Sequence, residues 1–461
     1  MAEPRTNPSR TKASTVRKPP PHLSSHSLLG SASPMHRDPL GFLLATRRYG
    51  EVVGMRFVFS PAYLIYHPDD VKHVLQENHF NYNKDVFTYH ILDPVLGAGL
   101  FTNDGESWLH QRRLIQPAFH RKCLVTYATL MTDATDAMLE SWQARQNADG
   151  PLDIAEEMMR LTLRIVGQAL FSLDLSQETS TVGQAVTTLV KLLGDYVYAP
   201  FPPISFPTPR NRHMQAAIHE LDTVTFRIIK ERREHPTDTG DLLSMLLLAR
   251  DEETGEGMND QQVHDEVMTL LLAGHETTAN ALTWTWYLLS QHPEIESRLH
   301  DELATVLGGN SPTIEHLPSL TYTSMVLHEA LRLYPPVWVL SRKAIADDEL
   351  GGFPIPQGSM VILSPYATHR HPAFWEKPEV FDPERFTPER VAARPHYAHF
   401  PFGGGPRLCI GSNFALMEAQ LVLATVAQHY RLRLAPGHPV VPEAKITLRP
   451  RYGMPMNLQR V

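Results

Sequence analysis

The sequence predicts a mainly α-helical protein with a smaller β-rich part. Over much of its 461 residues, apolar side chains recur at spacings of three and four, which places them on one face of a helix. Two short stretches, 52–58 and 63–66, are instead rich in β-branched and aromatic residues and predict strands. The 38 prolines gather between the helical segments, where they mark turns. A chain with 42% hydrophobic and 20% charged residues can form a large buried core.

The first 34 residues differ from the rest of the chain. They are polar and rich in proline, serine and basic residues, and they predict a disordered tail ahead of a single domain over residues 35–461. The tail has no apolar stretch long enough for a secretory signal, and no run of 18 apolar residues follows it. We therefore expect a soluble, cytoplasmic protein without a membrane span.

The expected elements follow one another along the chain. A turn at Ser60-Pro61 separates the two strands, and a helix opens at Pro68. The spacing predicts further helices over 133–146, 152–171, 182–197, 259–291 and 413–430. The longest begins at the capping pair Asn259-Asp260 and would span about 50 Å at 1.5 Å per residue. Residues 351–402 predict short strands and then an irregular loop packed by its aromatic side chains.

Charge and cysteine content exclude several classes of function. The 42 basic and 50 acidic residues give a net charge of −8, which argues against a nucleic-acid-binding surface and a nucleic-acid partner. Two cysteines cannot make a disulfide scaffold, a cysteine-rich zinc module or a four-cysteine iron–sulfur cluster. Cys123 lies on an apolar helix face, so we expect it to be a packing residue.

Cys409 stands in a different setting, the glycine-rich stretch 402–411 directly before a predicted helix. Glycines allow a bulky flat group to approach the backbone closely. The helix start and the neighbouring Arg407 favour a thiolate over a thiol. A thiolate in this setting suits the axial ligand of a haem iron, where it promotes O–O cleavage. Neither a dinucleotide-binding glycine fingerprint nor a Walker-type phosphate loop is present.

The pattern Phe-x-x-Gly-x-Arg-x-Cys-x-Gly at 402–411 resembles the haem-binding loop of the cytochrome P-450 family, in its soluble bacterial type. From about residue 35 onward the family's other motifs occur in order: Trp108-x-x-x-Arg112, Ala-Gly-His-Glu-Thr-Thr at 273–278, Glu329-x-x-Arg332, and Pro-Glu-Arg-Phe at 383–386. The resemblance implies the family's fold, with haem b sandwiched between the long central helix and the helix that follows the cysteine.

The same resemblance implies a role for each motif. Cys409 would ligate the iron, and Phe402 would pack near its sulfur. Thr277 would hydrogen-bond dioxygen, and Glu276 would help to deliver protons through water. The residues expected to bind the haem propionates are Trp108, Arg112, Arg342 and Arg407, although Arg342 has an equal alternative as an exposed strand arginine. The residues expected to form a buried triad supporting the cysteine loop are Glu329, Arg332 and Arg385.

The implied activity is that of a haem-thiolate monooxygenase, which inserts one atom of O2 into a lipophilic substrate by hydroxylation or epoxidation. By position, the residues expected to line the substrate pocket are Phe101, Leu270, Ala273, Gly274, Val337, Trp338 and Val339. Most are apolar, so we expect a fatty acid, a terpene or a macrolide-like compound. The alternative is a haem-thiolate protein that binds or senses a ligand without turnover.

Electrons are expected to come from NAD(P)H through separate partners, a reductase and a ferredoxin or flavodoxin, because the chain after Cys409 is too short for a fused reductase. No acidic residue lies between Ser107 and Thr132. The basic side chains in that stretch are Arg112, Arg113, Arg121 and Lys122. They predict a docking patch for an acidic redox partner. The equal alternative is that they are surface residues exposed to solvent without a docking role. We expect a monomer.

Overall fold

The computed structural model describes residues 19–23, 31–57, 60–144, 150–172, 181–198, 201–235, 239–251 and 255–461. Helices dominate these residues, as the sequence predicts. They are α1 (Ala32–Arg37), α2 (Pro39–Thr46), α3 (Pro68–Lys72), α4 (Phe87–His90), α5 (Asp93–Leu96), α6 (Gly105–Ile115), α7 (Arg121–Ala144), α8 (Ile154–Phe171), α10 (Thr181–Tyr198), α11 (Pro209–Glu234), α12 (Leu242–Leu248), α13 (Asp260–Gln291), α14 (Pro293–Leu307), α15 (Thr321–Leu333), α16 (Pro365–Thr368), α17 (Pro388–Ala392) and α18 (Ser412–Ala427).

The strands are short. They are β1 (Val52–Phe57), β2 (Ser60–Ile65), β3 (Tyr82–Asn83), β4 (Leu152–Asp153), β5 (Leu340–Ala344), β6 (Asp348–Leu350), β7 (Phe353–Ile355), β8 (Met360–Leu363), β9 (Tyr430–Leu434), β10 (Pro442–Ala444), β11 (Leu448–Pro450) and β12 (Pro455–Arg460). One sheet has the order β1-β2-β8-β5-β3, with β2 and β8 parallel and the other neighbours antiparallel. A second has the order β4-β12-β9, and β6–β7 and β10–β11 are two-stranded.

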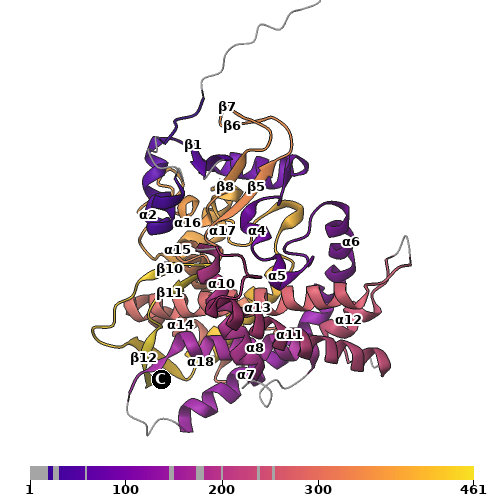
Figure 1. The fold of residues 1–461 in the computed structure, drawn as a ribbon. Helices are drawn as coiled ribbons and strands as arrows, with labels where there is room; N and C mark the ends of the chain where they lie inside the picture. Colours follow the sequence, from indigo (N-terminus) through magenta and orange to yellow (C-terminus); the bar gives the residue numbers. More distant parts are fainter. Residues whose placement is uncertain are drawn as a thin grey trace, which may run out of the picture.

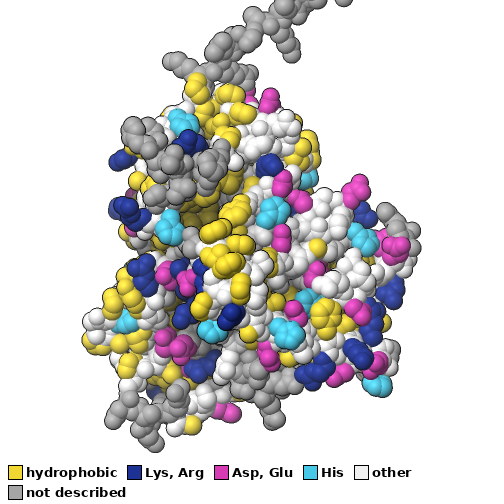
Figure 2. All heavy atoms as spheres, in the orientation of Figure 1, with side chains coloured by type: hydrophobic (Ala, Val, Ile, Leu, Met, Phe, Trp, Pro, Cys, Tyr) yellow, Lys and Arg dark blue, Asp and Glu magenta, His cyan; other side chains and the backbone are white. Residues whose placement is uncertain are grey.

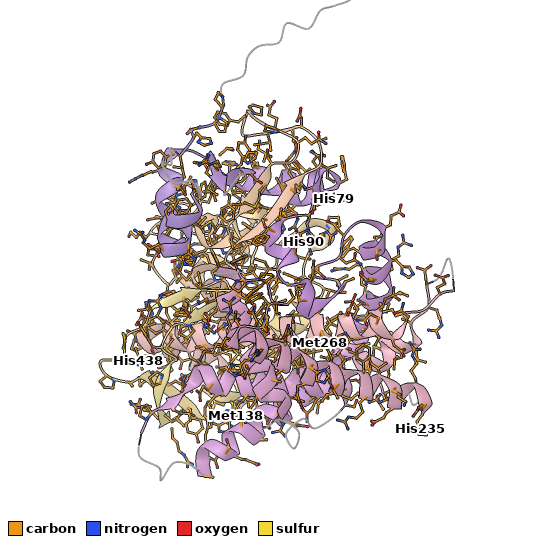
Figure 3. All side chains as sticks on the ribbon, in the orientation of Figure 1. His79, His90, Met138, His235, Met268 and His438 are labelled. Atoms are coloured by element: carbon orange, nitrogen blue, oxygen red, sulfur yellow. The ribbon has the colours of Figure 1, made fainter. Side chains whose placement is uncertain are left out.

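Helix α13 is the spine of the helical part. In Figure 1 the strands of the five-stranded sheet lie in the upper part of the molecule and most long helices in the lower part. Helix α13 packs along α8 and also contacts α11, α15 and α18. A Cβ atom at Gly274 would lie 3.1 Å from Val166 Cγ2, so glycine allows α13 and α8 to approach closely. Met268, labelled in Figure 3, is fully buried in this core.

The start of α13 agrees with its predicted cap. The Asn259 side chain accepts a hydrogen bond from the Gln262 N–H at 2.9 Å, and the Gln262 side chain accepts one from the Asn259 N–H at 2.9 Å. This reciprocal pair satisfies backbone donors that a helix start otherwise leaves open. The prediction of a long helix over 259–291 is confirmed.

Other element boundaries differ from the sequence prediction. Helix α7 begins at residue 121, ahead of the predicted 133, because buried Tyr127 and Met131 pack in the core and compensate for the β-branched residues of its first turns. Ser60 and Pro61, predicted as a turn, are the first residues of β2. The helix after Cys409 ends at Ala427, and the chain enters β9 at Tyr430.

The packed part of the chain begins before the predicted domain start at residue 35. The Gly54 N–H donates to the Pro21 carbonyl at 2.8 Å, and the Leu23 N–H donates to the Gly54 carbonyl at 2.9 Å. The Ser31 N–H likewise donates to the Arg56 carbonyl at 2.8 Å. Residues 21–23 and Ser31 therefore lie against β1, while residues 1–18 and 24–30 of the predicted tail lie outside the described residues.

Residues 351–402 have the predicted character, with strands β7 and β8 followed by short helical turns. Five aromatic side chains of this stretch are buried: Tyr366, Trp375, Phe381, Tyr397 and Phe400. On the face shown in Figure 2, hydrophobic side chains gather near the middle, and acidic and basic side chains are interspersed around them. No helix among the described residues is both long enough and apolar enough to cross a membrane.

Candidate active site

A cavity of about 950 Å³ lies between α13 and the loop that leads into α18. Its α13 wall runs from Thr269 to Ala281, and its opposite wall runs from Pro401 to Ala419. All seven residues predicted to line the substrate pocket contribute to it: Phe101, Leu270, Ala273, Gly274, Val337, Trp338 and Val339. The cavity thus has the predicted place, between the long central helix and the helix after the cysteine.

Cys409 and Phe402 line this cavity together. The Cys409 N–H donates to the Phe402 carbonyl at 3.0 Å, which closes the loop and holds the two residues side by side. Cys409 is exposed in this structure, and it lines the cavity. The sulfur is therefore placed to ligate a metal centre inside the cavity.

The sequence predicts that the glycines of the loop leave space for a flat ligand, and the structure shows that some of them instead allow close packing against protein. Gly403 has φ of +71° and a Cβ there would meet nothing within 4 Å, so this residue leaves open space beside the cavity. At Gly404 a Cβ would lie 2.3 Å from Tyr397 Cε1, and at Gly405 it would lie 1.8 Å from the Leu75 carbonyl oxygen. The latter two glycines allow the loop to pack against protein rather than against a flat ligand.

The cation that acts on Cys409 is Arg112, which corrects the expectation that Arg407 lies beside the sulfur. Arg112 donates to the Leu408 carbonyl at 2.9 Å, and its charge favours the thiolate. Arg407 instead pairs with Asp104 and lies 4.0 Å from the centroid of the Trp108 ring. Burial still raises the pKa of Cys409 above its ordinary value. A bound metal would counteract the effect of burial, because it favours the deprotonated form of a coordinating thiol.

A group of buried cations lies at one side of the cavity. Arg342, predicted as a propionate ligand or an exposed strand residue, is only 8% exposed and donates to the Tyr89 hydroxyl at 3.0 Å. Lys84, which the sequence analysis missed, is also 8% exposed and donates to the Phe101 carbonyl at 2.5 Å. Burial and the charges of Arg342 and Arg407 hold the pKa of Lys84 well below its usual range.

These cations provide a test of whether the site fits haem. Lys84, Arg342 and Arg407 all line the cavity, and the carboxylate that the structure pairs with this group is Asp104. Burial lowers the pKa of Arg407 to about 10, so the group carries charge that its surroundings do not fully stabilise. The two propionates of a haem would supply the missing negative charge. A cavity with a thiol on one wall and buried cations at its side fits this cofactor.

The acid and the alcohol predicted on α13 both face the cavity. The Thr277 hydroxyl donates to the Ala273 carbonyl at 2.6 Å, so its lone pairs remain available to a ligand. Glu276 is 5% exposed, and its Oε1 accepts a hydrogen bond from the Thr447 hydroxyl at 2.7 Å. Burial raises the pKa of Glu276, and the Thr447 hydrogen bond and the charge of Arg449 counteract part of this.

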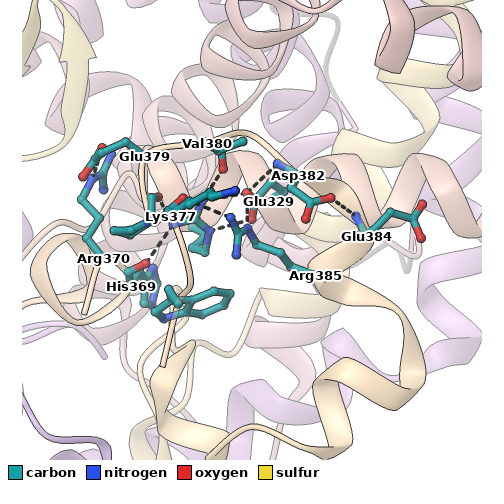
Figure 4. Close-up of polar contacts among 12 residues, drawn as sticks. Glu329, His369, Arg370, Lys377, Glu379, Val380, Asp382, Glu384 and Arg385 are labelled. Carbon is teal, nitrogen blue, oxygen red and sulfur yellow. Dashed lines mark hydrogen bonds and ion pairs between the residues drawn. The ribbon is translucent and has the colours of Figure 1, made fainter. Parts of the chain in front are cut away.

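The three residues of the predicted triad contact one another. Arg332 donates to both carboxylate oxygens of Glu329, at 2.6 and 2.7 Å, and Arg385 forms an ion pair with Glu329 at 3.3 Å. Arg332 also donates to three backbone carbonyls, those of His369, Pro378 and Val380. Figure 4 shows this cluster, including the Asp382 N–H that donates to Glu329 at 2.9 Å.

Two residues outside the predicted motifs hold the cysteine loop: His369 connects it to this cluster, and Tyr397 connects it to Gln76. The Phe400 N–H donates to His369 Nε2 at 2.9 Å, two residues before Phe402. The Tyr397 hydroxyl accepts from the Gly405 N–H and donates to Gln76, both at 3.0 Å. Neither residue belongs to a spaced motif. Their partners are distant in the chain, so a single sequence carries no signal for them.

Comparisons with known proteins agree with this geometry. The family model described as Cytochrome P450 matches residues 19–454. The chain is 41% identical to cyclooctatin synthase of Streptomyces melanosporofaciens, over 92% of this chain and 91% of that protein. It is 40% identical to the cyclooctat-9-en-7-ol 5-monooxygenase of the same organism, over 89% and 88%. It is 36% identical to the pentalenene oxygenase of Streptomyces avermitilis, over 91% and 93%.

A solved structure gives the same result for the fold. The heme domain of cytochrome P450DA superposes with a TM-score of 0.88 and 28% sequence identity, covering 96% of this chain and 98% of that domain. The mainly helical fold with small sheets, the cavity between α13 and α18, and a family match over nearly the whole chain agree. The chain belongs to the cytochrome P450 family of haem-dependent monooxygenases.

Proposed function

We propose that this protein inserts one atom of O2 into a terpene, with haem b ligated by Cys409 and electrons supplied from NAD(P)H by a separate reductase and a ferredoxin or flavodoxin. The observation that carries the proposal is the placement of Glu276 and Thr277 on the cavity wall opposite Cys409. A protein that only binds a ligand needs a pocket and an iron ligand. It has no need of a buried acid beside a hydroxyl in that pocket.

Each step assigned to the chain follows from a described contact. Bound haem would supply the activation of dioxygen, and the Cys409 thiolate would hold its iron. Cys409 holds its place through the Phe402 carbonyl, and the cations Lys84, Arg342 and Arg407 would bind the propionates. The Thr277 oxygen, whose proton goes to Ala273, would accept a hydrogen bond from water or a protonated ligand. Glu276 would pass protons to that position and recover them from solvent water.

The terpene assignment rests on the cavity and on the relatives. Most of the residues around the substrate region are aliphatic or aromatic, which suits a hydrocarbon or an alcohol with a single polar group. Two of the similar proteins are named for cyclooctat-9-en-7-ol and pentalenene, both terpenes. A rigid polycyclic skeleton would lose little conformational freedom on entering such a pocket, which favours its binding.

The test uses the purified holoprotein. The ferrous–CO spectrum should show the red-shifted Soret band of a thiolate ligand, and terpene hydrocarbons and alcohols should shift the iron to high spin. With a ferredoxin or flavodoxin, its reductase and NAD(P)H, a shifting compound should yield a product that carries one oxygen atom from 18O2. A normal CO spectrum with no oxygenated product from terpenes, fatty acids or macrolides would instead establish the ligand-binding alternative.

A further inference from the structure

Thr447 makes two hydrogen bonds that join a hairpin to the acid of α13. It lies between β10 and β11 and is only 4% exposed. Its hydroxyl donates to Glu276 Oε1 at 2.7 Å, and the same oxygen accepts from Asn280 Nδ2 at 3.0 Å. Glu276 and Asn280 are one turn apart on α13 and face the same side. One hydroxyl group therefore bridges two successive turns of the helix at the carboxyl group.

The direction of the Thr447 proton is fixed by its partners. The Asn280 amide N–H can only donate, so it occupies a lone pair of the Thr447 oxygen. The single hydroxyl proton is then free to point to Glu276, where it stabilises the ionised form of the carboxyl group. Asn280 thus orients Thr447, and Thr447 orients Glu276.

The backbone that carries Thr447 is itself held on both sides. The Trp284 indole N–H donates to the Leu448 carbonyl at 2.9 Å, and the Trp338 indole N–H donates to the Lys445 carbonyl at 2.9 Å. The Leu448 N–H also donates to the Pro336 carbonyl at 2.9 Å. These bonds restrain the residues before and after Thr447, so its hydroxyl is presented to Glu276 from a fixed position.

The hairpin tip also belongs to the cavity. Lys445, Ile446 and Thr447 line it together with Glu276 and Thr277. The charged groups nearest to the acid on this side are paired elsewhere: Lys445 with Asp195 at 3.0 Å, and Arg449 with Glu443 at 3.0 Å. The Thr447 hydroxyl is thus the group of the hairpin that touches the carboxyl directly, and it does so where a substrate would make contact.

We infer that Thr447 is a positioning residue for proton delivery: it holds the Glu276 carboxyl group in the orientation from which protons reach the Thr277 position. The inference rests on the role of Glu276 in the proposed function. Because Thr447 lines the cavity, a bound substrate would lie close to the residue that orients Glu276.

The test compares Thr447→Val, which keeps the shape and removes the hydroxyl, with Thr447→Ser, which keeps the hydroxyl. In the valine variant, turnover should fall about tenfold, as expected for one lost hydrogen bond to a charged group, and more of the consumed electrons should appear as hydrogen peroxide. The serine variant should restore both quantities. Because Thr447 lines the cavity, substrate affinity is measured separately by the spin shift, and turnover and peroxide yield are compared at saturating substrate.

A second readout does not depend on turnover. The infrared carbonyl band of protonated Glu276, identified by its loss in Glu276→Gln, should persist to higher pH in the valine variant, because the pKa of Glu276 rises when its donor is removed. The matched control is Thr283→Val, a buried threonine of the same helix that donates to the Ala279 carbonyl at 2.7 Å. It should leave the Glu276 band unchanged.

The outcomes separate this inference from the proposed function. If Thr447→Val shows the wild-type infrared titration and the wild-type peroxide yield while Glu276→Gln loses turnover, Thr447 does not position the acid. Failure of Thr447→Ser to restore either readout would also overturn the role of the hydroxyl. If Glu276→Gln turns over normally while the infrared titration still shifts in Thr447→Val, the contact is supported and the proton-delivery role of Glu276 is lost.

Discussion

Gly405 lies directly against the carbonyl oxygen of Leu75: a Cβ atom at Gly405 would be 1.8 Å from that oxygen, at a φ of +64°. Leu75 belongs to the π-helical turn η2 (His73–Glu77), and Gly405 opens the turn η8 (Gly405–Arg407) that precedes Cys409. Only a residue without a side chain fits between the two backbones. The contact fixes the distance between the turn η2 and the cysteine loop.

Replacing Gly405 by alanine should therefore displace the cysteine loop. The haem content per protein and the thiolate CO spectrum, both measured on purified protein, should decrease strongly. Gly437→Ala is the matched control, because Gly437 also has a positive φ, +77°, and open space around its Cβ position, and it is not among the residues that line the cavity. Both variants carry the strain of a left-handed conformation, about 1–2 kcal/mol. Equal losses in the two variants would show that the Leu75 contact does not matter.

Removing the buried charge of Lys84 should weaken haem binding and stabilise the protein without haem. Lys84→Met relieves the repulsion from Arg342 and Arg407, so the free energy of unfolding of the apoprotein should rise. The rate of haem transfer to excess apomyoglobin should increase about tenfold, since a charge-assisted bond is lost. Lys72→Met, at a surface pair with Glu77, is the control. An unchanged haem-transfer rate in Lys84→Met would argue against a propionate contact.

Changing Arg332 to lysine should destabilise the protein severely. A lysine cannot reproduce the bidentate pair with Glu329 together with bonds to three carbonyls. Disruption of a buried charge network costs on the order of 3–5 kcal/mol, to be measured as the free energy of unfolding in denaturant. Arg298→Lys, at the exposed pair with Glu384, should change it by less than about 1 kcal/mol. Similar values for the two variants would contradict a supporting role for the triad.

The stability of the protein should depend on pH through Glu266. This carboxyl group of α13 is fully buried and accepts from the Leu100 N–H at 3.0 Å; burial raises its pKa from 4.5 to about 8. Between pH 4.5 and 8 the folded protein keeps a proton that the unfolded chain releases. The free energy of unfolding therefore falls as pH rises through this window and levels off above it.

Glu266→Gln keeps an acceptor for Leu100 and removes the titration, so its stability should fall less than that of the wild type from pH 5 to pH 8. The comparison isolates Glu266, because the neighbouring charged groups His264, Asp265 and Asp222 are the same in both proteins. Parallel stability curves for the two proteins would show that Glu266 is ionised at all these pH values.

Reversing the charge of Arg113 should slow electron transfer from an acidic partner. Arg113 is exposed on α6, one residue after Arg112, which contacts the cysteine loop. The first-electron reduction rate of Arg113→Glu should be lower than that of the wild type at low ionic strength, and the difference should shrink as salt is added. The side chains of Arg121 and Lys122 lie outside the described residues. A rate ratio that does not vary with salt would remove Arg113 from the docking surface.

The sequence predicts those parts of the site whose chemistry is local in the chain. Cys409 has its glycines and helix within ten residues, and Glu329 and Arg332 share one helix face. Lys84 and Thr447 could not be found this way, because each acquires its role from partners more than 15 residues distant. Proximity in the sequence predicts that Arg407 lies beside the sulfur. The loop instead turns its side chain to Asp104 and Trp108.

The cavity takes its walls from residues as far apart as Met35 and Thr447. The sulfur of Cys409 and the Glu276–Thr277 pair that faces it lie far apart in the sequence. Binding of haem therefore requires that nearly the entire polypeptide is folded. In a mutant library, the colour of the bound cofactor would screen for complete folding before any substrate is known.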